Sequence, residues 1–340
     1  MSDQTKIPSR SLNLSMISLI LGVIFCISLL IWPRSILDMT WFVAESMVLV
    51  APLVIPGIVL AAWIIASGAD SYIARAFEGR LLYAIVAASA IGAITPVCGV
   101  TVLPLMAGLL AAGVPLAPVM AFWLSSPVTD PAMLATTAAT LGISFAVGKT
   151  LAAFGLGLFG GVVTLGFSDR DWYKTSLRSN RIVGHLSENA CAKALSFKAG
   201  IWGDAERRVI FRRNFIATTK LILICLIPAF AAEYALNAVL QPEALSDYVG
   251  EDVWWAIPFA VFVGAPAYLD GYAALPLTRG LMEHGMSQGA AMAFLVSGGV
   301  VSIWGAMAIF PVLRIRPFLL YLSLAVTGSL IAGYVFDWVS

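Results

Sequence analysis

Nine apolar runs follow one another along the chain, and they constrain its fold more than any other feature. Most are about 20 residues long or longer, which is the length that an α-helix needs to cross the hydrocarbon core of a bilayer. Charged residues make up only 11% of the chain, whereas soluble domains carry about 25%. The sequence therefore predicts an all-α polytopic membrane protein with the lipid bilayer as its surroundings.

One long polar connection divides these runs into two groups. Residues 168–214 carry ten basic and five acidic side chains, and apolar runs lie on both sides of them. The first run, Met16–Trp32, is expected to be a retained helix, because no small-residue cleavage site of the kind that ends a signal peptide follows it. We therefore expect four parts: an N-terminal tail with a first transmembrane helix over 1–40, a first repeat over 41–167, a basic cytoplasmic loop over 168–214 and a second repeat over 215–340.

The two groups resemble each other when the sequence is shifted by 172 residues. No gap is needed, and the matched pairs include Pro56 with Pro228, Gly92 with Gly264, Gly99 with Gly271, Leu103–Leu105 with Leu275–Leu277, Met120–Phe122 with Met292–Phe294, and Ser125 with Ser297. Apolar sequence produces chance matches, but a shared proline or glycine marks a shared special backbone geometry. The pattern predicts an internal duplication.

The distribution of basic residues predicts that the two repeats are inverted. Loops rich in lysine and arginine stay in the cytoplasm, which applies to 168–214, whereas the acidic loop 241–252 is expected outside. Nine plain crossings conflict with this rule. The conflict disappears if Leu81–Gly113 is a re-entrant hairpin and Trp254–Gly285 is its counterpart from the other side. Each half then has three crossings and one hairpin, and nine plain crossings remain the alternative.

Proline, glycine and hydroxyl residues interrupt four of the runs, at 95–99, 125–131, 267–271 and 297–302. Irregular backbone inside a bilayer persists only where protein or a water-filled cavity satisfies its polar groups. Secondary transporters built from inverted repeats bind their solutes at such breaks, near the bilayer midplane. The breaks therefore predict a solute site. Its predicted binding residues are Cys98, Ser125, Ser126, Thr129, Asp130, Tyr268, Asp270, Ser297 and Ser302, and its predicted hinges are Pro96, Gly99, Pro127, Pro131 and Gly271.

Two carboxylates, Asp130 and Asp270, form the polar centre of this predicted site. A carboxylate at the bilayer centre costs at least about 2.5–3.5 kcal/mol, so it is a functional candidate. Asp130 directly precedes Pro131 and is therefore also a good helix N-cap. We expect one of the two to exchange a proton during transport. Lys149 and Lys220 lie near the ends of their runs, and we expect both to extend to the membrane surface.

Several other classes of function are disfavoured. A net charge of +1 argues against nucleic-acid binding, and four cysteines without a C-x-x-C pair, with two histidines, argue against a metal cluster. No Walker A sequence is present, and neither intramembrane aspartate has the Gly-x-Gly-Asp setting of an intramembrane protease. We therefore expect neither an enzyme nor a bound metal or cofactor. A membrane scaffold or maturation factor that docks partners on 168–214 is the alternative to a transporter.

Two stretches resemble the ArsP-like predicted permease family, which includes organoarsenical efflux permeases. One is Thr95–Gly113 with Ala121–Pro131, and the other runs from Leu269 to Gly299. The resemblance covers residues 42–335 and implies a permease with two related halves. The family's first turn often reads C-S-C-G, whereas here it reads P-V-C-G, so that only Cys98 remains. A single thiol is a weak ligand for a trivalent arsenical, and the resemblance does not fix the solute.

These features together predict a secondary transporter in a bacterial inner membrane. It is expected to export a small solute, such as a metalloid, an organometalloid or a related toxicant, with proton coupling. The identity of the solute, the transport direction, the coupling ion and any homo-oligomerisation are left open by the sequence.

Overall fold

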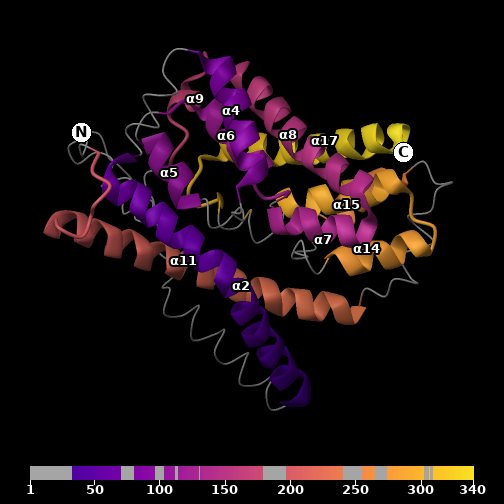
Figure 1. Cartoon of the computed structure of the whole chain (residues 1–340). Helices are drawn as coiled ribbons and strands as arrows, with labels where there is room; N and C mark the ends of the chain where they lie inside the picture. Colours follow the sequence, from indigo (N-terminus) through magenta and orange to yellow (C-terminus); the bar gives the residue numbers. More distant parts are fainter. Residues whose placement is uncertain are drawn as a thin grey trace, which may run out of the picture.

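The computed structural model describes residues 33–69, 80–95, 103–111, 114–129, 131–178, 197–239, 255–264, 274–301, 306 and 309–340. Within these ranges every regular element is an α-helix, which confirms the predicted all-α membrane fold (Figure 1). The helices are α2 (Pro33–Ser67), α4 (Leu81–Ile94), α5 (Leu103–Ala111), α6 (Leu116–Ser125), α7 (Pro131–Leu141), α8 (Ile143–Leu165), α9 (Asp171–Lys174), α11 (Ala205–Val239), α13 (Ala256–Gly264), α14 (Ala274–Glu283), α15 (Gln288–Val300) and α17 (Ile315–Val339).

Two of the described helices, α8 and α17, are long and apolar enough to cross a membrane by themselves. A third span results if the two parts of α2, Arg34–Leu49 and Val54–Ser67, are counted together across their bend of 53°. The bend coincides with Pro52 and Pro56, since proline removes a helical hydrogen bond and its ring crowds the preceding turn. The apolar helices α4, α6 and α15 are shorter than a full crossing.

The interruptions expected from the sequence lie between helices. The run Leu81–Leu110 is divided into α4 and α5, and the next run is divided into α6 and α7. Pro131 is the first residue of α7, where the missing N–H of proline costs nothing because it would have no helical partner. By contrast, α2 and α11 begin earlier than the apolar runs suggested, at Pro33 and Ala205, because their polar first turns continue the helix beyond the apolar band.

The 172-residue offset recurs in the bounds of the helices. α6 and α15 begin at equivalent positions, and so do α8 and α17. These coincidences support the predicted duplication.

Equivalent helices also cross at equivalent glycines. A Cβ at Gly92 would collide with the Ser125 hydroxyl, and a Cβ at Gly264 would lie 2.5 Å from the Ser297 hydroxyl. Only glycine allows these backbones to approach so closely. The same relation holds at two further glycines: the nearest side chains are Ile85 and Ala121 at Gly161, and Ile257 and Ala293 at Gly333.

Each pair of equivalent long helices is antiparallel. Gly148, near the start of α8, contacts Phe336, near the end of α17, and Leu156 contacts Gly328 at the middle of both helices. α2 and α11 cross each other on one side of the bundle (Figure 1). Their opposite directions follow from Arg207, near the start of α11, which donates to the carbonyl groups of Ala66 and Ser67 at the end of α2 at 3.2 and 2.9 Å.

Candidate functional site

A cavity of about 30 Å³ lies where three of the helix breaks meet. This volume exceeds the roughly 10–15 Å³ that one water molecule needs. The cavity is bordered by residues from the α6–α7 break, from the ends of α13 and α14, and from the end of α15, together with two side chains of α7 and α8. They are Pro127, Val128, Met133, Lys149, Gly264, Ala274, Phe294, Leu295, Gly298 and Gly299.

The two halves touch each other at the wall of this cavity. A Cβ at Gly299 would lie 2.9 Å from the carbonyl oxygen of Pro127, so the end of α15 packs against the backbone of the α6–α7 break. Pro127 and Gly299 are equivalent residues at the 172-residue offset. The predicted hinge Pro127 therefore lies in the contact between the halves.

Among the described residues that line the cavity, Lys149 is the one with a charged side chain. Its side chain is buried, with 2% of the residue exposed, and its Nζ lies 3.1 Å from the Sδ of Met133. The expectation that Lys149 extends to the membrane surface is therefore wrong. The linear sequence shows only how far Lys149 lies from the end of its run, whereas the packing of α8 against α7 determines which face of the helix it occupies. Lys220 on α11, in contrast, is exposed.

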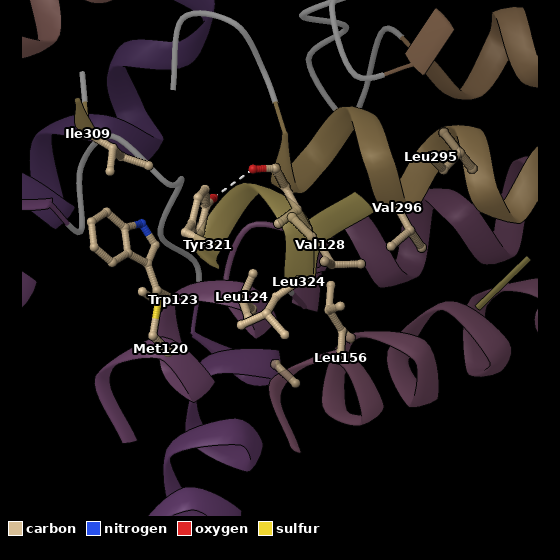
Figure 2. Close-up of a cluster of buried hydrophobic side chains, with 14 of the residues drawn as sticks. Met120, Trp123, Leu124, Val128, Leu156, Leu295, Val296, Ile309, Tyr321 and Leu324 are labelled. Carbon is tan, nitrogen blue, oxygen red and sulfur yellow. Dashed lines mark hydrogen bonds between the residues drawn. The ribbon is translucent and has the colours of Figure 1, made fainter. Parts of the chain in front are cut away.

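Tyr321 of α17 is the repeat equivalent of Lys149, and it is also buried (Figure 2). Its hydroxyl donates to the carbonyl of Val300 at 2.7 Å, at the end of α15. Its ring packs against Trp123 of α6, with ring centroids 5.4 Å apart. Both members of this equivalent pair are thus polar groups at a helix break. The sequence analysis missed Tyr321, although the repeat register that relates it to Lys149 was available.

Three buried polar atoms on α6, α7 and the break between them lack a hydrogen-bond partner among the described residues. The indole Nε1 of Trp123 and the hydroxyls of Ser126 and Thr137 are buried and have no hydrogen-bond partner among the described residues. Ser126 precedes the cavity residue Pro127, and Thr137 lies one helical turn beyond the cavity residue Met133 on α7. An indole N–H is only a donor, whereas a hydroxyl both donates and accepts. None of these three side chains is among the described residues that line the cavity.

The described members of the predicted site occupy two kinds of position. Ser125 and Ser297 are buried, and each hydroxyl donates to a carbonyl of its own helix, Phe122 and Phe294 respectively, at 3.1 Å. Neither is among the described residues that line the cavity. Thr129 is buried next to the cavity residue Val128. Solute binding by these residues stays a prediction.

The other predicted site residues lie outside the described residues: Pro96, Cys98, Gly99, Asp130, Tyr268, Asp270, Gly271 and Ser302. Two of the segments that contain them nevertheless adjoin, along the chain, residues that line the cavity. Residues 265–273, which include Asp270, connect the cavity residues Gly264 and Ala274. Asp130 follows Val128 closely in the chain.

Removing the Tyr321 hydroxyl is expected to destabilise the protein. Tyr321→Phe leaves the buried carbonyl of Val300 without its donor, which costs about 1–3 kcal/mol. Thermal unfolding of the detergent-purified protein measures the effect. Tyr334→Phe on the same helix is the matched control, because Tyr334 is 50% exposed. Equal melting temperatures for the two variants would contradict a structural role for this hydrogen bond.

Comparison with known proteins identifies the family of this chain. A family model described as predicted permease, ArsP_1, matches residues 36–338. The UPF0718 protein MJ0584 of Methanocaldococcus jannaschii is 27% identical over 288 residues, which cover 72% of this chain and 79% of that protein. No solved structure matches. Since the family model matches most of its length, the chain belongs to the ArsP_1 family of predicted permeases.

Proposed function

We propose that this membrane permease is a secondary transporter that moves a small solute through the cavity at the helix breaks, between two inverted halves. The observation that carries the proposal is the antiparallel pairing of equivalent helices around a cavity that both halves line. Family membership supports a membrane permease and leaves the solute open.

The direction of α8 and α17 supports inversion of the halves. These helices begin at equivalent positions, and each is long enough to span a bilayer. They run antiparallel, because Gly148 contacts Phe336 while Leu156 contacts Gly328. Two spans that occupy equivalent places in a duplicated chain and run antiparallel cross the bilayer in opposite directions. Inverted repeats of this kind are typical of secondary transporters.

The ends of α6 and α15 support the same conclusion. At the start of α6 the Ala117 N–H bonds the Tyr173 hydroxyl at 3.3 Å, beyond the C-terminal end of α8. At the start of α15 the Gly289 N–H bonds the Asp337 carboxylate at 3.0 Å, near the C-terminal end of α17. Because α8 and α17 are antiparallel, their C-terminal ends lie on opposite sides. The equivalent helices α6 and α15 therefore start from opposite sides.

Two contacts support a twofold relation between the halves, with the cavity on its axis. A residue that contacts its own equivalent lies on such an axis. Pro127 touches its equivalent Gly299, and Leu156 touches its equivalent Gly328. The first pair also lines the cavity. In transporters with inverted repeats the solute site lies at the repeat interface near the midplane, which is the location that we propose for this cavity.

We further propose that the protein resides in a bacterial inner membrane and exports a metalloid, an organometalloid or a related toxicant in exchange for protons. The basic loop 168–214 would face the cytoplasm. Residues 176–178, in the first part of this loop, pair with residues 312–314 just before α17, since the Arg178 N–H donates to the carbonyl of Val312 at 2.9 Å and the Arg314 N–H donates to the carbonyl of Ser176 at 2.8 Å. These two arginines therefore share one side of the protein, as the charge rule requires.

Inversion predicts that positions 112 and 284 lie on opposite sides of the membrane. Ala112→Cys and His284→Cys, each introduced alone into a chain without its native cysteines, are expected to react with an impermeant maleimide from opposite sides. The measurement compares labelling of intact cells with labelling of inverted membrane vesicles. Arg178→Cys serves as the cytoplasmic reference. Labelling of both test positions from the same side would contradict the inverted arrangement.

Flux through vesicles tests the proposed activity. A deletion strain is first screened for sensitivity to metalloids, metals and organic toxicants, and the solute that emerges is loaded into proteoliposomes containing the purified protein. A transporter accelerates the efflux of that solute, and an imposed pH gradient accelerates it further if protons are exchanged. A membrane scaffold moves nothing under any gradient. Liposomes with heat-denatured protein are the control.

A further inference from the structure

We infer that the N-terminal apolar run Met16–Trp32 docks on an exposed apolar face in the first part of α2, so that the two form an antiparallel hairpin. The run lies outside the described residues, and it also precedes residues 36–338, which the family model matches. The inference therefore concerns a part of the chain to which the family assigns no role. It does not depend on the proposed transport activity.

The first part of α2 exposes an apolar stripe. Its members recur at spacings of four, three and four residues, which places them on one face of the helix: Leu37, Trp41, Ala44 and Val48. All four are exposed, and Trp41 and Val48 are each 74% exposed. A different face of α2 packs against α11, where the ring centroids of Phe42 and Tyr234 are 5.6 Å apart.

The described helices leave this α2 stripe uncovered. A hollow of about 390 Å³ runs along it, and α2 alone supplies the described lining, which consists of Trp41, Ala44, Glu45, Val48 and Leu49. The first part of α2 also projects beyond α11, away from the other labelled helices (Figure 1). The stripe is therefore accessible to a segment outside the described residues.

The equivalent face of α11 has a different composition. At the 172-residue offset, the α2 stripe corresponds to four exposed residues of which two are basic: Val209, Arg213, Ile216 and Lys220. Lipid tails are as apolar as leucine, so lipid alone could cover an apolar stripe. Equivalent helices of a duplicated chain would meet lipid alike, however, and lipid therefore gives no reason for this difference.

The two helices do differ in the sequence that precedes them. Met16–Trp32, directly before α2, has no charged residue. Its equivalent before α11, residues 188–204, contains four: Glu188, Lys193, Lys198 and Asp204. The apolar face thus occurs on the helix that follows an apolar run, and the basic face occurs on the helix that does not. This correlation identifies the run as the occupant of the α2 stripe.

The length of the run and its connection to α2 fit an antiparallel pair. As a helix, the 17 residues of Met16–Trp32 extend for about 25 Å, and the 16 residues from Pro33 to Val48 extend for about 24 Å. Trp32 directly precedes Pro33, and a residue before proline is disfavoured in an α-helix, so the chain is expected to turn there. Consecutive elements joined by a short connection usually lie side by side.

Disulfide cross-linking tests the hairpin. With the turn at Trp32 and Pro33, Trp41 is expected to lie level with Ile24, and positions 23–26 cover every face of the run because they make one helical turn. Trp41→Cys is combined with one cysteine at position 23, 24, 25 or 26, where Cys26 is native, and all other native cysteines are replaced by serine. We expect oxidation in membranes to link at least one pair within one chain, since a disulfide forms only where the Cα atoms are about 4.4–6.8 Å apart.

The readout separates links within one chain from links between copies. Trypsin cleaves after Arg34, between the two cysteines, so mass spectrometry of the non-reduced digest identifies the joined peptides. Mixing two differently tagged forms of the chain reveals links between copies. Links only between copies would assign the α2 stripe to a second copy and overturn the inference. The absence of links at all four positions, in protein that elutes as folded in size-exclusion chromatography, would leave the stripe to lipid and also overturn it.

Two variants serve as controls. Arg213→Cys, at the equivalent position of α11, replaces Trp41→Cys and is expected to form no link with positions 23–26. Val48→Lys introduces the residue that α11 carries at the equivalent position, and it is expected to lower the yield of the link several-fold because a charge disfavours docking of the apolar run. If Trp41→Cys does not fold, Leu37→Cys with cysteines at positions 27–30 replaces it, since Leu37 is expected to lie level with Ser28.

Discussion

Gly157→Leu is expected to eliminate correctly folded protein, whereas Gly155→Leu, two residues away on α8, is expected to leave folded protein at the wild-type level. A Cβ at Gly157 would lie 2.7 Å from the carbonyl oxygen of Ala121 and 2.8 Å from the Ser89 hydroxyl. The first of these atoms belongs to the backbone of α6 and cannot rotate away. Three helices, α4, α6 and α8, therefore have to separate to admit any side chain at this position.

The alanine variants make this comparison quantitative. Gly157→Ala is expected to cost about 1–3 kcal/mol, as overpacking of a tight contact does. Gly155→Ala meets no atom within 4 Å and is expected to be neutral or slightly stabilising, since alanine is the better helix former. Size-exclusion chromatography and thermal unfolding of the detergent-solubilised variants measure the difference. Comparable destabilisation at both positions would contradict the described packing of α8.

Asp270→Asn is expected to abolish proton-driven flux while leaving membrane insertion and folded yield unchanged. The substitution keeps the size and the hydrogen bonding of the side chain and removes its titratable carboxyl group. Asp270 belongs to the segment between Gly264 and Ala274, both of which line the cavity. Flux of the screened solute in proteoliposomes, with and without an imposed pH gradient, measures the effect. Wild-type acceleration by the gradient would reject the proton-exchange role.

Asp130, in the first half of the chain, can be compared with Asp270 in the second half. Because Asp130 directly precedes Pro131 in the chain, we expect Asp130→Asn to keep an N-cap that Asp130→Ala would remove at a cost of about 1 kcal/mol. The Asp130→Asn protein is therefore expected to be more stable than the Asp130→Ala protein, although both variants lack the charge of Asp130. If the two variants unfold alike, capping is not what Asp130 contributes.

The positions of the breaks followed from the sequence because proline and glycine act locally. Pro131 is the first residue of α7, and α4 ends at Ile94, directly before the predicted break at 95–99. The starts of α2 and α11 were predicted too late, because an apolar run marks where a helix enters lipid and not where it begins. Arg207 is an example, since it lies on a helical turn outside the apolar run and donates to the end of α2.

The candidate site was harder to predict, because burial depends on which face of a helix meets its neighbours. Lys149 is only a few residues from the start of α8, and its direction is determined by α7, which packs against it. Ser125 and Ser297 drew attention as polar residues at the breaks, yet their hydroxyls pack against Gly92 and Gly264 where helices cross. Sequence alone does not distinguish a hydroxyl that faces a cavity from one that faces a glycine.

The contacts between equivalent residues identify the fixed points of the proposed transport cycle. In a carrier of this design the second state is reached when the two halves exchange their conformations, so each contact is replaced by its image at the 172-residue offset. The pairs Pro127–Gly299 and Leu156–Gly328 are their own images and persist in both states. The contact of Gly148 with Phe336 is different, because its image joins Thr164 to Leu320. Helices α8 and α17 would then separate at one end of their contact and approach each other at the other end. The Leu156–Gly328 contact in the middle would be the pivot.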